Sequence, residues 1–159
     1  MILRSMRFLG ALALLAVGAV HLQQYIAADY RAIPTIEPLF LLNAIGSGVV
    51  SIGLLLPVDR PSTARLGRVV VGVLALGAVA IAAASLAALS VSESGSLFGF
   101  SESGFRTVIV VAIVAEAPTI VLLAPVAAVS LGQAFPTTRE ATGRRGRGRA
   151  AWPDQGAAT

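Results

Sequence analysis

Four long runs of apolar residues dominate the chain. They cover about residues 8–27, 38–57, 69–91 and 107–131. A bilayer core about 30 Å thick needs roughly 20 helical residues to cross it, so each run is long enough. None shows the polar–apolar alternation of a lipid-facing barrel strand, and helices satisfy their own backbone hydrogen bonds in lipid. The pattern predicts an all-α fold, a four-helix transmembrane bundle with up-and-down topology and short loops.

Composition supports a lipid environment. Of the 159 residues, 56% are hydrophobic and only 13% are charged, whereas soluble domains carry about 25% charged residues. The mean hydropathy is +0.83. Cysteine is absent, which excludes disulfides, thiolate metal sites and a cysteine nucleophile. After Pro136 the composition changes to Arg, Gly, Ala and Thr, so we expect a membrane domain over 1–135 and a disordered tail over 136–159.

Arginine is distributed unevenly around the four runs. Arg31 and Arg106 lie in the first and third connections. Ten others lie before the first run, between the second and third, and after the fourth: Arg4, Arg7, Arg60, Arg65, Arg68, Arg139, Arg144, Arg145, Arg147 and Arg149. Basic residues concentrate on the cytoplasmic side of multi-pass proteins. We therefore expect a multi-pass protein of the cell membrane with both termini in the cytoplasm.

The first run allows a second interpretation. Its uninterrupted apolar part, Phe8 to Val20, has the length of a signal-peptide core, and Val17 and Ala19 are small enough for a cleavage site. A retained helix is favoured because three later runs already anchor the chain. Both interpretations give the later helices the same orientation.

The arginine-rich tail has three interpretations. Its basic residues are Arg144, Arg145, Arg147 and Arg149. They act as a topology signal, or they attract anionic lipid headgroups, or they bind nucleic acid. Nucleic acid is the least favoured partner, because Trp152 is the sole aromatic residue beyond the arginines.

Small residues at a spacing of four indicate close helix packing rather than a ligand site. In the second run such pairs are Ala44 with Gly48 and Ser47 with Ser51. The third run offers the series Ala80, Ala84 and Ala88.

Glu116 is the most informative single residue. It lies roughly 13 Å along the fourth helix from the outer end. An acidic side chain near the bilayer centre costs on the order of 2.5–3.5 kcal/mol on insertion scales, so such residues usually face the bundle interior. One interpretation is a protonated glutamate that joins helices by hydrogen bonds. The other is a group that carries protons or binds a ligand.

Two more polar residues fall at a similar predicted depth. His21 is the sole histidine and lies near the outer end of the first helix, and Asn43 lies about five residues into the second. We therefore predict that His21, Asn43 and Glu116 face one another in the outer half of the bundle. Four further residues share their helix faces and extend the predicted cluster: Gln24, Tyr25, Ser47 and Thr119.

The first third of the chain carries a weak resemblance to known proteins. The stretch Gly18-Ala19-Val20-His21-Leu22, then Tyr25, Tyr30, Ile33-Pro34 and Leu39-Phe40-Leu41-Leu42-Asn43, resembles a pattern in small actinobacterial four-helix membrane proteins of unknown function. The layout is also similar to DoxX-like proteins, some of which are linked to quinone or respiratory redox systems. The charged residues of that family are not evident, so no catalytic residue carries over.

Two functional hypotheses follow. The first is a non-enzymatic membrane component, such as a subunit of a homo-oligomer or larger complex, whose polar groups hold the helices together. The second is a small transporter or a quinone- or proton-handling protein with a polar site in the outer half of the bundle. The sequence specifies no cofactor, and a haem held by two histidines would need a second copy of the chain.

The predicted orientation is testable with single introduced cysteines, because the chain has none of its own. We expect Arg60→Cys and Arg144→Cys to be protected from a membrane-impermeant thiol reagent in intact cells. Arg31→Cys and Ser96→Cys should be labelled. Labelling of position 60 with protection of position 96 would reverse the orientation.

Overall fold

The computed structural model describes residues 1–27, 36–57, 64–94 and 107–135, with 93, 94, 107 and 108 described by their backbone only. The predicted tail, 136–159, lies outside the described residues, as do the three connections between the helices.

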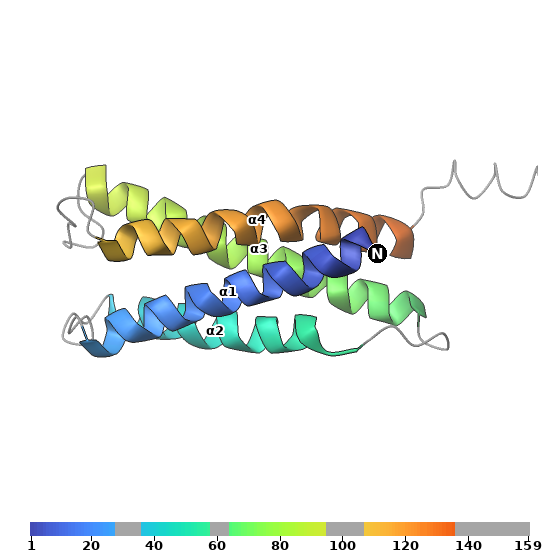
Figure 1. Cartoon of the computed structure of the whole chain (residues 1–159), viewed down its shortest axis with the longest axis horizontal. Helices are drawn as coiled ribbons and strands as arrows, with labels where there is room; N and C mark the ends of the chain where they lie inside the picture. The colour runs from blue at the N-terminus through green and yellow to red at the C-terminus, as the bar shows by residue number, and fades with distance from the viewer. Residues whose placement is uncertain (28–35, 58–63, 95–106, 136–159) are drawn as a thin grey trace, which may run out of the picture.

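The described chain forms four helices (Figure 1): α1 (Ile2–Ala27), α2 (Glu37–Leu55), α3 (Ala64–Ser94) and α4 (Thr107–Ala134). Each is long and apolar enough to cross a membrane. This confirms the predicted all-α, four-helix class. The helices extend beyond most of the apolar runs, and α1 begins at Ile2 rather than near Phe8, so Arg4 and Arg7 lie within it.

Successive helices run in opposite directions, as Figure 1 shows. Each helix packs against its neighbours in sequence, and α1 also packs against α4, which closes the bundle. Two pairs of helices lie diagonally opposite each other in the bundle. Of these, α1 touches α3, whereas the described parts of α2 and α4 do not touch.

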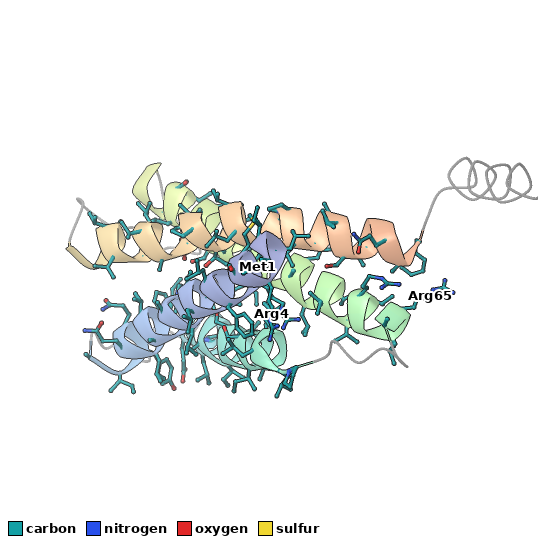
Figure 2. All side chains as sticks on the ribbon, turned by 45° about the vertical axis from the view of Figure 1, so that its right-hand side comes forward. Met1, Arg4 and Arg65 are labelled. Atoms are coloured by element: carbon teal, nitrogen blue, oxygen red, sulfur yellow. The ribbon has the colours of Figure 1, made fainter. Side chains whose placement is uncertain are left out.

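The two ends of the bundle differ in character. One end, here called the Tyr25 end, is where α1 and α3 finish and α2 and α4 begin. The opposite end carries the start of α1 and of α3, with Arg4, Arg65 and Arg68, and is here called the arginine end. Figure 2 labels Met1 and Arg4 near the middle of the view and Arg65 at its right-hand end.

The core is apolar and narrow, and the outside is apolar too. Leu14, Leu54 and Leu123 are fully buried between the helices. Large aliphatic side chains such as Leu42 and Val121 are more than half exposed, at 69% and 68%. A water-facing bundle would not display so much contiguous apolar surface, whereas lipid is a good solvent for it.

Glycines let the helices approach closely at two points that matter below. A Cβ atom placed on Gly10 would lie 2.6 Å from the Leu123 side chain of α4. One placed on Gly18 would lie 2.9 Å from Ser47 Cβ and 3.2 Å from the Ala44 carbonyl oxygen of α2. These contacts fix how α1 is aligned along both of its neighbours.

Only some of the small residues predicted to pack helices lie between the helices. Ser47 and Ser51 are fully buried, but a Cβ on Gly48 would meet nothing within 4 Å. On α3 the predicted series does not form the buried stripe, because Ala80 and Ala84 are exposed and Ala88 is only half-buried. The alanines that α3 buries follow a different helical stripe: Ala75, Ala78 and Ala82. Ala80 and Ala84 lie on the side of α3 turned away from the core, which spacing alone does not reveal.

The Gly18 contact gives a stability prediction. We expect Gly18→Ala to destabilise the bundle by about 1–3 kcal/mol, because the new methyl group would force α1 away from the α2 backbone. Gly48→Ala is the matched control, since open space surrounds that position and alanine has the higher helix propensity. Thermal unfolding in mild detergent measures both. Equal melting temperatures would contradict the close approach.

Candidate functional site

Glu116 is buried inside the bundle. Its side chain is 1% exposed, and among the described residues neither carboxyl oxygen has a hydrogen-bond partner. A buried polar group without a partner costs roughly 1–3 kcal/mol, and more when it is charged. In native proteins such a group often marks a site that another molecule, ion or proton completes.

His21 on α1 is held from both sides of its ring. Its Nδ1 lies 2.9 Å from the Val17 carbonyl oxygen, and its Nε2 lies 3.1 Å from Ser85 Oγ on α3. The Phe40 ring of α2 lies against it, with centroids 5.2 Å apart. A carbonyl oxygen can only accept, so Nδ1 carries the proton in this arrangement and Nε2 of the neutral ring accepts from Ser85.

Ser85 links His21 to Glu116. Besides its hydrogen bond to His21, its hydroxyl group interacts with the Glu116 carboxyl group, although at a geometry that leaves both carboxyl oxygens without a hydrogen bond. The sequence pattern does not single out Ser85. One serine in an alanine-rich helix looks like an ordinary packing residue, and only its position across the bundle diagonal gives it two polar neighbours.

The close contacts of α1 show why these side chains lie at one depth. Gly10 faces Leu123 of the antiparallel α4. Val17 on α1 and Glu116 on α4 each lie two helical turns, about 10 Å, from that contact toward the Tyr25 end. Val17 is also the residue whose carbonyl group holds His21. On the other side of α1, Gly18 faces Ser47 of α2. We call the group of His21, Ser47, Ser85 and Glu116 the polar layer.

The remaining predicted residues form local hydrogen bonds. Ser47 donates to Asn43 Oδ1 at 3.1 Å on the same helix. Thr119, fully buried on α4, donates to the Ala115 carbonyl oxygen at 2.9 Å. Their placement beside Glu116 at contact distance stays a prediction.

Tyr25 and Gln24 lie beyond the polar layer, toward the Tyr25 end. The Tyr25 hydroxyl group donates to Glu37 Oε1 of α2 at 3.2 Å. This bond ties the ends of α1 and α2 together and draws Tyr25 away from Glu116. Gln24 is half-buried one turn beyond His21.

Donors are scarce around Glu116. The hydroxyl protons of Ser47, Ser85 and Thr119 are already given to Asn43, His21 and Ala115. Their oxygens therefore offer lone pairs, as the carboxyl group itself does. Ser51, one turn from Ser47, is a buried hydroxyl without a partner, but it makes no bond to Glu116. A group that completes the site would therefore bring a hydrogen-bond donor, a positive charge or a proton.

Among the described residues, no buried arginine neutralises Glu116. Arg7 is the other buried charged side chain of the described residues, and its guanidinium group lies over the Phe8 ring. It lies one turn from Gly10 toward the arginine end, about 15 Å along the bundle from the level of Glu116. Within the described ranges, no three His, Asp or Glu side chains gather as a metal site would require.

Comparison with known proteins adds no relative. No family model, curated protein or solved structure matches the chain.

The His21–Ser85 bond gives a prediction. We expect Ser85→Ala to lower the free energy of unfolding by about 1 kcal/mol, because it removes the donor to a half-buried imidazole nitrogen. Ser90→Ala is the matched control, because the exposed Ser90 hydroxyl group donates to Leu86 of its own helix. Thermal unfolding gives the stabilities. The ¹⁵N spectrum of His21 should show a changed Nε2 environment in Ser85→Ala alone, and an unchanged spectrum would contradict the bond.

Proposed function

We propose that this chain is a proton-handling protein of the cell membrane that takes up and releases a proton at Glu116. The observation that carries this proposal is a carboxyl group 1% exposed whose two oxygens have no partner among the described residues. A proton is the simplest species that supplies the missing positive charge, and it needs no space of its own.

The geometry also suggests where the proton goes. In the proposed transfer, the O–H group of neutral Glu116 turns toward a Ser85 oxygen whose own proton is bonded to His21 Nε2. Transfer breaks the Glu116 O–H bond and forms a Ser85 O–H bond, while the former Ser85 proton forms an N–H bond on His21. The products are a carboxylate and an imidazolium, so the total charge of the polar layer does not change.

The competing function is a structural membrane subunit whose polar groups join helices. The His21–Ser85 bond across the bundle favours it. Glu116 argues against it, because neither carboxyl oxygen forms a hydrogen bond to another helix among the described residues, as a group that only joins helices would. The proton-handling hypothesis explains the same bonds and also the unsatisfied carboxyl group.

The ends of the bundle fit an orientation in the cell membrane. Arg4, Arg65 and Arg68 gather at the arginine end, and the first two are labelled in Figure 2. We assign this end to the cytoplasm, where basic residues concentrate and anionic lipid headgroups attract them. The tail arginines beyond α4 would add to that attraction.

Infrared spectroscopy tests the proposal. A protonated carboxyl group has a carbonyl stretch that its ionised form lacks. We expect such a band in the folded protein, its disappearance on titration with base, and its absence in Glu116→Gln. Glu37→Gln is the matched control, since Glu37 lies at the Tyr25 end with a hydrogen bond to Tyr25, and it should keep the band.

The experiment has a clear negative outcome. A folded protein whose protonated-carboxyl band is the same in Glu116→Gln, or whose band never titrates, does not exchange a proton at Glu116. The structural-subunit function would then be preferred.

A further inference from the structure

We propose that Glu116 exchanges its proton through the Tyr25 end alone, because an apolar layer closes the bundle toward the arginine end. This inference rests on the proposed function and adds the direction from which the site is reached. In the assigned orientation, the Tyr25 end is the outer face of the membrane.

Polar groups continue from Glu116 toward the Tyr25 end. Ser85 follows first, then His21, which is half-buried rather than sealed. One turn beyond His21 lie the half-buried Tyr25 and its acceptor Glu37. A proton that enters near Glu37 therefore meets groups that can accept and donate it as it moves inward.

In the other direction the buried hydroxyl groups of Thr119 and Ser51 come first, and beyond them the core becomes apolar. Leu14 lies one turn from Gly18 toward the arginine end, Leu54 lies two turns from Ser47, and Leu123 two turns from Glu116. All three are fully buried, and Val126 beside Leu123 is 2% exposed. These four side chains belong to one packed cluster, here called the apolar layer. It contains no group that can carry a proton, and its close packing leaves little room for water.

A positive charge lies on the far side of the apolar layer. Arg7, buried on α1, is about 15 Å from the level of Glu116. Its guanidinium group stays protonated in proteins, so it repels a proton approaching from the arginine end. Arg65 and Arg68 of α3 add charge of the same sign at that end.

The titratable groups around Glu116 are therefore few. Of the two helices packed against α4, α1 brings His21 on one side of the apolar layer and Arg7 on the other. The described part of α3 brings Ser85, which does not titrate at ordinary pH, and its arginines at the far end. From α2, which does not touch α4, Glu37 stands at the Tyr25 end. Glu116 is thus coupled to the membrane face at the Tyr25 end. Such an arrangement suits a protein that senses external pH rather than one that conducts protons across the membrane.

The test uses membrane vesicles of both orientations. A membrane-permeant carbodiimide modifies protonated carboxyl groups buried in lipid, and mass spectrometry of the Glu116 peptide measures the modification. The pH is varied on one side while buffer holds the other side constant. An Arg65→Cys variant, treated with an impermeant thiol reagent, identifies which face of each preparation carries the arginine end.

We expect modification of Glu116 to be lost when the pH is raised on the side of the Tyr25 end. It should not change when only the pH at the arginine end is raised. Leu123→Ser introduces a hydroxyl group into the apolar layer and should make the modification respond to both sides. Val121→Ser, at a residue 68% exposed to lipid on the same helix, is the matched control and should keep the one-sided response. Leu54→Ser introduces a hydroxyl group into the apolar layer from α2 and should likewise make the modification respond to both sides.

The outcomes separate the two proposals. A response of the unaltered protein to the arginine-end pH, to both sides, or to neither side while modification still occurs overturns the one-sided access. No modification of Glu116 under any condition, in protein shown to be folded, overturns the proposed proton exchange itself.

Discussion

Lipid provides no hydrogen-bond partner, and this constraint explains most of the structure. Every polar group between the membrane faces must be satisfied inside the bundle or bear the cost of being alone. The backbone meets the constraint by forming helices. Ser47 and Thr119 meet it by donating within their own helices, and His21 by bonding both to α1 and to α3. The Ser51 hydroxyl group and the Glu116 carboxyl group do not meet it among the described residues, and of these two groups Glu116 is the one that can carry a charge.

The polar layer exists because α1 is aligned along two neighbours at once. Gly10 against Leu123 sets its position along α4, and Gly18 against Ser47 sets it along α2. A larger residue at either glycine would separate the helices or slide them past each other. A slide of one turn, about 5.4 Å, would carry His21 out of reach of Ser85. Packing that looks purely structural therefore controls the chemistry of the layer.

The fold was readable from the sequence because its signals are long and strong, whereas the site depends on single contacts. The four apolar runs predicted four helices, and their polar interruptions led to the prediction of a site at His21 and Glu116. The pattern did not single out Ser85, because helix periodicity does not say which residues of α3 meet α1 across the bundle. Likewise Arg7 looked like a flanking charge, yet an additional turn of α1 places it inside the bundle. The mutual contact of His21, Asn43 and Glu116 stays a prediction.

In the proposed relay, Ser85 as a bridge makes proton exchange compatible with the burial of Glu116. An isolated carboxylate in a low-dielectric interior is expensive, because nothing replaces its hydration. If the proton moves only as far as His21, the carboxylate acquires an imidazolium partner across one hydroxyl group, and the opposite charges attract strongly where water is absent. The two forms of the layer then differ by a displacement of protons rather than by a net charge. Loss of the proton to water needs a further step at His21, the member of the relay nearest the Tyr25 end. In the proposed relay, the residue that stabilises the ionised glutamate is thus also the one that controls its exchange.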